Sequence, residues 1–308
     1  MPYDISEKLV VAVSSRALFD LEDENRIFET EGVERYRRYQ IEHAETALKP
    51  GLGFPFIKRL LSLNALIPEY QPVEVILLSR NDPDTGMRVI NSIDACGLGI
   101  ERSAFLGGGD RMKYLDPFNV SLFLSANYED VKKAVDDGYP AGQILPRRPM
   151  ADDESDPEFR LAFDFDGVVA SDEAEQVFAA DGLQGFEAHE RERAAQTLGP
   201  GPLHRFIRGM SAVQRHEQDH FSDDLDYVPV VRTAVITARA APAHKRAMNT
   251  LREWGIRADE ALFLGGVSKR SFLEEFRPHI FFDDQLSHLD PELLGTAAVH
   301  IPYGIRNP

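Results

Sequence analysis

The sequence is poor in cysteine and in basic residues. Among its 308 residues there is one cysteine, Cys96, so no disulfide can form within the chain, and a reducing compartment is expected. The 34 Lys and Arg residues are outnumbered by 51 Asp and Glu residues, which gives a formal net charge of -17. Polymeric nucleic acid requires a basic protein surface, so it is not expected as a partner. A small phosphorylated ligand is compatible with this charge, because a bound divalent cation can reverse the local field.

The sequence also lacks a long apolar run. No stretch approaches the roughly 20 apolar residues of a membrane span, and the first residues, MPYDISEKL, have no signal-peptide pattern. We therefore expect no membrane partner and a cytoplasmic location. The composition, 43% hydrophobic and 28% charged, is typical of a globular protein with one or two sizeable cores. The sequence leaves open whether the chain forms a homo-oligomer.

The chain carries one pattern twice. Residues 246–285 superimpose on residues 88–127 without a gap, with residue numbers that differ by 158. The run Phe-Leu-Gly-Gly at 263–266, for example, falls on the same run at 105–108. Up to residue 207 the numbers of the two copies differ by 150 instead. Solenoid repeats have periods of about 20–50 residues, so a repeat of this length indicates a duplicated domain.

Each half alternates short apolar runs with longer amphipathic stretches. The runs are too short for helices and too uniformly apolar for strands with one wet face, so we expect buried strands. They lie at 161–163, 233–237, 261–264 and 279–282 in the second half, and at 8–13, 73–78, 103–106 and 120–124 in the first. Helical spacing of apolar residues marks 243–254 and 269–276. Strands that alternate with helices indicate a parallel sheet covered by helices on both faces.

The predicted fold class is therefore α/β, with two tandem Rossmann-like, three-layer domains that arose by internal duplication. We place these domains at residues 1–150 and 151–308, because the segment 147–159 is polar, acidic and Pro-containing, as linkers are. About 60 residues connect the first two strands of the second half. This is long for a crossover connection, so we expect a cap insertion at about 173–230, and a matching one at about 21–70.

The first chemical feature is Asp164, which ends a predicted strand in the stretch DFDGVVASD. In a doubly wound sheet, ligands bind at the carboxyl ends of the strands, where a carboxylate can act as a nucleophile. Asp166 lies two residues on and can serve as general acid and then as general base. Gly167 lets the chain turn close to a ligand. Taken alone, this stretch is also compatible with a turn or a calcium-type loop.

Three further strand ends carry residues of the same chemistry. Thr237 closes the second strand and offers a hydroxyl to a phosphoryl oxygen. Lys269 follows a Leu-Gly-Gly turn and offers a point charge. Asp283 and Asp284 close the fourth strand, and adjacent carboxylates require compensation. Mg²⁺ prefers such hard oxygen ligands, so we predict it as the cofactor.

The first copy has lost these acids. Its small polar and basic residues leave two cations and no metal-binding acid, so we predict a non-catalytic domain, and its degenerate pocket is a candidate site for a regulatory anion. A nucleotide is a candidate occupant. The alternative is that the two arginines form salt bridges with acids such as Asp20 or Asp110. The residues of the predicted anion site are Ser14, Arg16, Ser79 and Arg111. In the alignment of the two copies they correspond to Asp164, Asp166, Thr237 and Lys269.

The order Asp-x-Asp, Thr, Lys, Asp-Asp resembles the haloacid dehalogenase (HAD) superfamily of aspartate-nucleophile phosphotransferases. Over nearly its full length the chain further resembles the cytosolic 5'-nucleotidase type I family. The stretches that carry this resemblance are SSRALF (14–19), GVERYRRYQIEH (32–43), FDFDGVVASDEAE (163–175), GPL (201–203), ITAR (236–239), RPHIFFDDQ (277–285) and HIPYG (300–304). Phe165 and Gly167 depart from the residues usual in the animal members, but both acids of the motif are in place.

This resemblance implies a HAD-like catalytic domain that removes phosphate from nucleoside 5'-monophosphates with Mg²⁺. Asp164 would be the nucleophile and Asp166 the acid and base, and Thr237 and Lys269 would hold the phosphoryl group. Asp164, Asp166 (through its carbonyl), Asp283 and Asp284 would hold the metal. The alternatives are a HAD phosphatase or phosphomutase that acts on a sugar phosphate, and a non-enzymatic nucleotide sensor.

Residues that contact the substrate are harder to identify from the sequence. Arg239 can reach phosphate or the cap, or form an ordinary salt bridge. Phe186 and Phe206 can stack on a nucleobase or pack between cap and core. The histidines of the predicted cap have no metal-ligand spacing, and we interpret them as surface residues. The candidate substrate-binding set is Gly167, Ala238, Arg239, Phe186 and Phe206.

Overall fold

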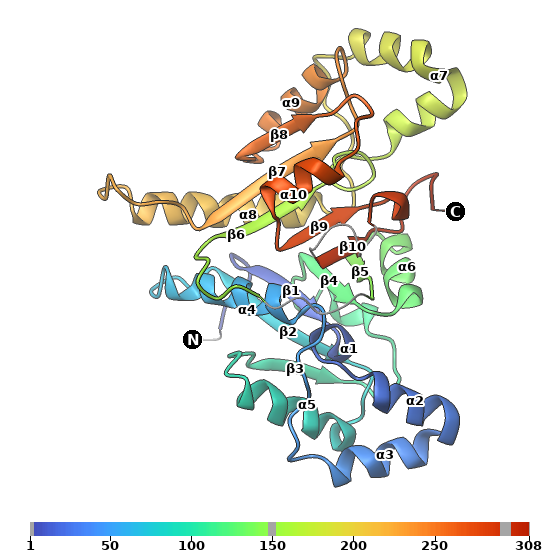
Figure 1. The fold of residues 1–308 in the computed structure, drawn as a ribbon, viewed down its shortest axis with the longest axis vertical. Helices are drawn as coiled ribbons and strands as arrows, with labels where there is room; N and C mark the ends of the chain where they lie inside the picture. The colour runs from blue at the N-terminus through green and yellow to red at the C-terminus, as the bar shows by residue number, and fades with distance from the viewer. Residues whose placement is uncertain (1–2, 147–151, 290–296, 308) are drawn as a thin grey trace. The chain divides into compact units, whose positions relative to one another are not determined.

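The computed structural model of the chain describes residues 3–146, 152–289 and 297–307. It contains two compact units, residues 1–126 and 127–308 (Figure 1). Both are α/β units built on a mostly parallel sheet. The boundary predicted between residues 150 and 151 lies outside the described residues. The segment that follows Ala126 clusters with the second unit because its strand pairs there, as described below.

The first unit has a parallel sheet in the order β3-β2-β1-β4. Its central strands β1 (Leu9–Val13) and β2 (Val73–Ser79) are buried along their whole length, as the uniformly apolar runs predicted. The other elements are β3 (Arg102–Phe105), β4 (Leu122–Ser125), α1 (Ser15–Leu18), α2 (Glu22–Glu31), α3 (Val33–Glu42), α4 (Phe54–Ser62), α5 (Pro83–Ala95), and the 3₁₀ turns η1 (Leu63–Ala65) and η2 (Met112–Tyr114).

The second unit has a sheet in the order β5-β10-β9-β6-β7-β8. All the described pairs are parallel except β5 with β10. Its strands are β5 (Ala141–Ile144), β6 (Phe159–Phe163), β7 (Val231–Thr237), β8 (Glu260–Phe263), β9 (Ile280–Asp283) and β10 (Ala297–His300), and its helices are α6 (Tyr128–Asp136), α7 (Glu173–Glu192), α8 (His204–His220), α9 (His244–Glu253), α10 (Arg270–Phe276) and the 3₁₀ turn η3 (Leu286–His288).

The strands predicted in both halves are confirmed to within a few residues, and so are α9 and α10. Two strands were not predicted. The sequence of β5, AGQI, has neither a uniform apolar run nor strict alternation, and β10 was likewise not predicted. These two strands pair with each other in antiparallel fashion. That pairing joins residues more than 150 positions apart, beyond the reach of local patterns.

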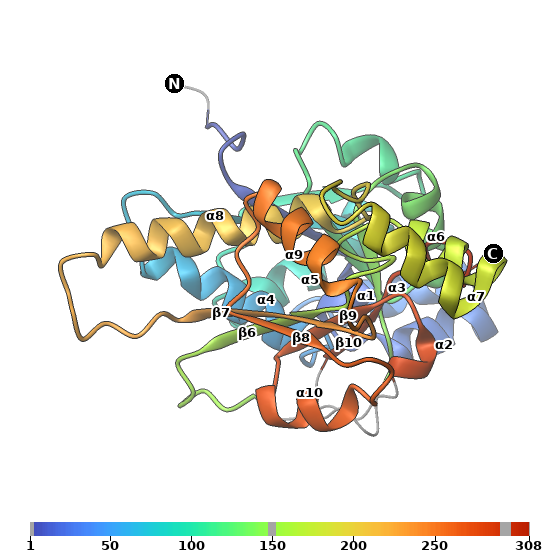
Figure 2. The same ribbon diagram turned by 90° about the horizontal axis from the view of Figure 1, so that it is seen from above.

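Helices cover both faces of the second unit's sheet. Figure 2 shows α8 and α9 on one side of the strands and α10 on the other. On the α10 side, Leu273 and Phe276 pack on Ala162 and Phe281. On the α8 side, the Phe206 ring lies 6.1 Å from the ring of Phe163. Alternate residues of β6 and β9 thus face opposite layers, which fixes the strand ends between two packed cores.

The predicted cap segment forms two helices of different kinds. α8 has a buried face and packs on the sheet. α7 is a pair of helices joined at a kink, where Gly182 has φ 66°, a conformation that glycine adopts readily. Among its described residues only Ala174 and Glu190 are buried. None of the described helices combines the length and the apolar composition that a membrane span requires.

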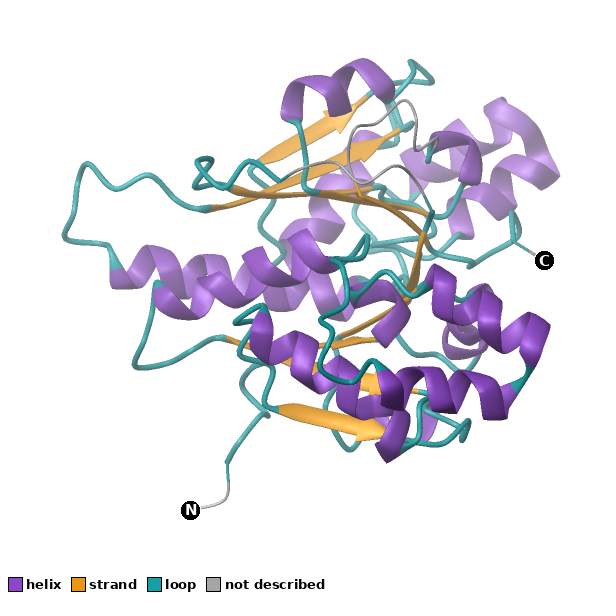
Figure 3. Cartoon of the chain, turned by 60° about the horizontal axis from the view of Figure 1, so that its bottom comes forward, coloured by secondary structure: helices purple, strands orange, loops and turns teal. Residues whose placement is uncertain are grey.

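The central strands of the two units have the same neighbours, and both units combine strands with covering helices (Figure 3). β1 lies between β2 and β4, and β6 lies between β7 and β9, in each case in parallel. The residue after each central strand makes the same bond, from Ser14 N to Leu124 O at 2.9 Å and from Asp164 N to Phe282 O at 2.8 Å. The strand ends of the two units can therefore be compared position by position.

Candidate active site

Asp164 lies where β6 ends, with 4% of its surface exposed. The chain then turns sharply, and Val169 N and Ala170 N both bond to the carbonyl of Phe165. Gly167 has φ 74° in this turn, and an added Cβ would lie 2.7 Å from the Asp284 carboxyl group. Glycine is required here for two reasons: the backbone conformation and the close approach of Asp284.

Lys269 joins two of the acids. It precedes α10 and is buried, with its Nζ 2.8 Å from Asp164 Oδ1 and 2.6 Å from Asp283 Oδ2. Burial disfavours the ammonium form, but the two carboxylates outweigh it and raise the pKa of Lys269. The lysine therefore stays charged and can attract a phosphoryl group at this strand edge.

The acids of the site hold their protons to different extents. Burial raises the pKa of Asp164 to about 7, and burial together with Asp164 and Asp283 raises that of Asp284 to about 9. Although burial opposes it, Lys269 and then His288 lower the pKa of Asp283. Both carboxyl oxygens of Asp284 are buried without a hydrogen-bond partner among the described residues. Such oxygens need a proton or a cation.

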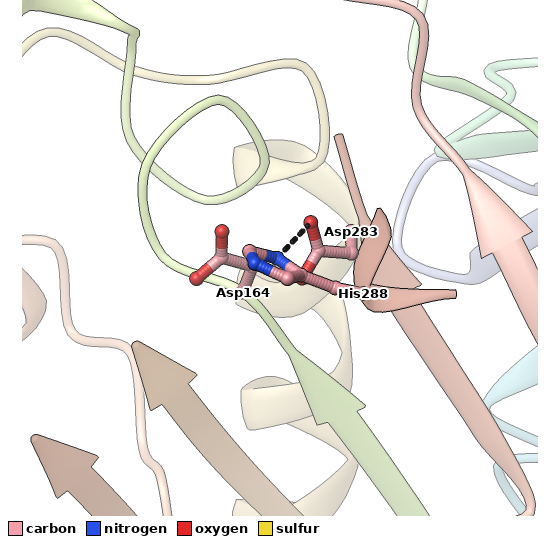
Figure 4. Close-up of side chains that lie close together, drawn as sticks. All are labelled: Asp164, Asp283 and His288. Atoms are coloured by element: carbon pink, nitrogen blue, oxygen red, sulfur yellow. Dashed lines mark hydrogen bonds and ion pairs between the residues drawn. The ribbon is translucent and has the colours of Figure 1, made fainter. Parts of the chain in front are cut away.

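Three of these side chains could hold a metal ion. Ligand atoms of Asp164, Asp283 and His288 all lie within 4.8 Å of one another (Figure 4). His288 was not predicted from the sequence. Its Nδ1 lies 3.1 Å from Asp283 Oδ2, so it also orients that carboxylate, as outer-shell partners of metal ligands do. The unpartnered oxygens of Asp284 and the hard oxygen donors beside them fit Mg²⁺.

Asp166 is held by Arg239. Arg239 Nε and Nη2 lie 2.7 Å from Asp166 Oδ2 and Oδ1, a two-point contact. On its other side, Arg239 bonds to the fully buried Glu190 of α7. Burial opposes the charge of Arg239, but Asp166 and Glu190 raise its pKa. Thr237, buried at the end of β7, accepts a hydrogen bond from Arg239 N at 3.2 Å.

The comparisons with known proteins identify the family. A sequence model of the 5'-nucleotidase family matches residues 1–308. The chain belongs to the 5'-nucleotidase family. It is 35% identical over 300 residues to cytosolic 5'-nucleotidase 1B of Homo sapiens. The aligned region covers 95% of this chain and 48% of the human protein. The chain thus spans about half the length of this curated relative. No solved structure gives a significant match.

The residues predicted to contact substrate lie in different environments. Phe206 is fully buried and packs against both Phe163 and Phe282, so it lies in the core, which is one of the two roles expected from the sequence. Phe186 stays partly exposed on α7, edge-on to Phe178 with ring centroids 6.3 Å apart. Ala238 is exposed beside Thr237, Gly167 is buried against Asp284, and Arg239 points at Asp166.

The residues predicted to bind an anion in the first unit have protein partners. Arg16 is paired with Glu22 at 3.3 Å rather than with Asp20. Ser14 Oγ accepts a bond from Ala17 N, and Ser79 Oγ lies 3.2 Å from Ser15 Oγ. Arg111 is buried with its guanidinium 5.5 Å from the Phe123 ring centroid. A regulatory anion at these residues stays a prediction.

Proposed function

We propose that this chain is a Mg²⁺-dependent 5'-nucleotidase that hydrolyses nucleoside 5'-monophosphates through an aspartyl-phosphate on Asp164. The observation that carries this proposal is the convergence of Asp164, Lys269, Asp283 and Asp284 at adjoining strand ends, with one lysine bonded to two of the acids. Family membership and the name of the human relative support nucleotides as substrates. The order of motifs supports a HAD-like catalytic domain.

Hydrolysis would proceed in two displacements at phosphorus. A carboxylate oxygen of Asp164 attacks phosphorus while the bond to the 5'-oxygen breaks, and Asp166 gives its proton to that oxygen. Water then attacks the phosphorus of the acyl-phosphate, and Asp166 takes up a proton from it. Asp164 is released as a carboxylate, with inorganic phosphate as the second product. Lys269 and Thr237 stabilise the negative charge of the transferring group.

Asp164, Asp283 and Asp284, with the carbonyl of Asp166, would hold Mg²⁺. When bound, the ion supplies positive charge that offsets the crowded acids and draws electrons from the phosphoryl group. The oxygens of Asp284, which have no hydrogen-bond partner among the described residues, support this assignment.

We also propose that the two units arose by duplication, that α7 belongs to a cap, and that the protein is cytoplasmic. The matching strand order of the units supports the first of these.

The direct test is phosphate release from a panel of nucleoside 5'-monophosphates and sugar phosphates, with Mg²⁺ and with excess chelator. Nucleotides should be preferred, and Asp164→Asn should reduce turnover to below about 1% of wild type, because an amide cannot form the acyl-phosphate. Asp223→Asn is the matched control, because Asp223 is an exposed acid of the same unit. Preference for a sugar phosphate, or undiminished release by Asp164→Asn, would refute the proposal.

A further inference from the structure

A network of alternating charges, buried at Arg239, Glu190 and Arg246, leads away from Asp166. Arg239 bonds to Asp166 and to Glu190. Glu190 bonds in turn to Arg246 Nη1 at 2.8 Å, and Arg246 reaches Glu173 at 3.1 Å. Glu173 and Glu190 lie near opposite ends of α7. These ion pairs thus connect both halves of this kinked helix to the carboxyl group of Asp166, which is proposed as acid and base.

Comparison with the first unit shows which of these bonds serve the fold alone. The arginine, asparagine and hydroxyl residues that tie the helix after the second strand to the connecting segment recur at equivalent positions in both units. They make the same bonds, so they serve the fold whether or not the catalytic acids are present. These bonds are Arg246 to Gln196 O and Arg88 to Thr46 O, Asn249 to Ala194 O and Asn91 to Ala44 O, and Leu198 N to Thr250 and Leu48 N to Ser92.

Arg239 and Glu190 do not recur. The position of Arg239 is taken by Asn81 in the first unit, and that of Glu190 by Gln40. There a neutral bridge replaces the ion pair, because Gln40 Nε2 donates to Tyr36 Oη at 3.1 Å and Tyr36 Oη donates to Asn81 Oδ1 at 2.9 Å. The link from Gln40 to Asn81 is therefore made without an ion pair, although Arg88, which also bonds to Gln40, is paired with Glu24. The scaffold does not require the buried ion pair of the second unit.

The ion pair occurs in the unit that has the catalytic acid: Asp166 stands where the first unit has Arg16, which is turned to Glu22. We propose that Arg239, backed by Glu190, is a positioning residue that fixes the carboxyl group of Asp166 for proton transfer to the leaving oxygen. A two-point contact sets both the direction and the plane of a carboxyl group. Glu190 in turn accepts a hydrogen bond from Arg239 Nη1 and so fixes the orientation of the guanidinium group. This role rests on the proposed function and replaces the substrate contact first considered for Arg239.

The test compares two substrates that differ in one bridging atom. One is AMP, and the other is its 5'-deoxy-5'-thio analogue, whose sulfur leaves as a thiolate without needing a proton. The measured quantity is kcat/KM, which covers all steps up to release of the nucleoside. Loss of a general acid costs roughly 10²–10⁴-fold. Arg239→Met should therefore lower kcat/KM for AMP by about 10²-fold or more, and for the thio analogue by less than about 10-fold.

Two milder variants guard against misfolding of Arg239→Met. Arg239→Lys keeps one charged donor and should show a smaller difference between the substrates. Glu190→Gln copies the first unit and should show the same difference to a lesser degree. Asn249→Ala is the matched control: it removes a bond between the same segments and should lower the melting temperature without separating the two substrates.

The outcomes separate this inference from the proposed function. If wild type releases no phosphate from nucleotides, the proposed function fails. If wild type is active and the variants lose kcat/KM equally on both substrates, Arg239 binds substrate or only stabilises the fold, and the inference is overturned. A loss confined to AMP in Arg239→Lys and Glu190→Gln supports it, since neither a binding role nor a structural role depends on the bridging atom.

Discussion

Single residues at the strand ends of the second unit carry charge where the core around them is apolar. Asp164, Lys269 and Asp283 are nearly inaccessible to solvent and are bonded to one another. One lysine cannot neutralise Asp164, Asp283 and Asp284 together, so Asp284 is left protonated or in need of a cation. This imbalance leads to two predictions.

The first concerns Gly167. In Gly167→Ala the new Cβ would lie 2.7 Å from Asp284 Oδ2, so Asp284 must shift. We expect a loss of about 10–100-fold in Mg²⁺ affinity or in activity, as for other changes next to metal ligands. Gly255→Ala is the control, because Gly255 has φ 64° but nothing within 4 Å of its added Cβ. It should lower stability through backbone strain alone. Equal Mg²⁺ requirements in the two variants would contradict the role of Asp284.

The second concerns the stability of the metal-free protein. Asp284 has a pKa of about 9 when folded, against an ordinary value near 3.9 in the unfolded chain. The folded state thus binds an extra proton at Asp284 between these values, so the contribution of Asp284 to stability is greatest below about pH 4 and is lost as pH rises towards 9. Asp164, with its pKa raised to about 7, acts in the same direction.

Thermal unfolding in chelator, followed from pH 5 to pH 9, measures this effect. Asp284→Asn should flatten the decline, since an amide does not ionise, and added Mg²⁺ should stabilise wild type more at pH 9 than at pH 5. A melting temperature that is independent of pH in chelator, or the same slope in wild type and Asp284→Asn, would show that the buried acid is compensated in another way.

At the scale of elements, α7 is held by ion pairs rather than by an apolar face. Removing one partner of a buried ion pair costs about 3–5 kcal/mol, because the other charge is left buried. Arg246→Met should therefore lower the free energy of unfolding, but by less than this amount, because Arg239 remains paired with Glu190. Adding Glu190→Gln should recover part of the loss, because the amide carries no charge. Arg252 is an exposed residue of α9, the helix that also carries Arg246, so Arg252→Met should have little effect.

Denaturant unfolding of the four proteins tests this argument. A loss below about 1 kcal/mol in Arg246→Met, or no recovery in the double variant, would mean that water reaches Glu190 once the arginine is gone. The double variant also separates stability from catalysis, because Glu190→Gln should restore part of the stability while it lowers kcat/KM for AMP as proposed above.

The sequence predicted elements and site residues to different degrees. The buried central strands β6 and β7 end in apolar runs, so their ends, and with them Asp164 and Thr237, could be located from local pattern alone. His288 could not, because its approach to Asp283 depends on the course of the chain after β9. Glu190 lies in a strongly charged helix, where most residues are solvent-exposed. The exchange of Glu190 for Gln40 between the copies was the one signal in the sequence that could have identified it.

At the scale of the whole molecule, the second unit is larger than the repeat predicted. β5 pairs with β10, and α6 packs against β5. A fragment that begins at residue 153 would lack both elements and would expose the polar backbone groups of β10 as a sheet edge. Such edges pair with other chains and promote aggregation. We therefore expect the second unit to need α6 and β5 in order to fold stably.

We accordingly expect two fragments to behave differently. Residues 127–308 should unfold in one cooperative transition, with α6 and β5 in place, whereas residues 153–308 should aggregate or melt at a lower temperature. Gel filtration and thermal unfolding of both fragments measure this. The comparison isolates the segment that carries α6 and β5, since both fragments keep every proposed catalytic residue and both lack the first unit. If residues 153–308 were as soluble and as stable as residues 127–308, the β5–β10 pairing would contribute nothing to the unit, and the boundary predicted from the repeat would describe it better.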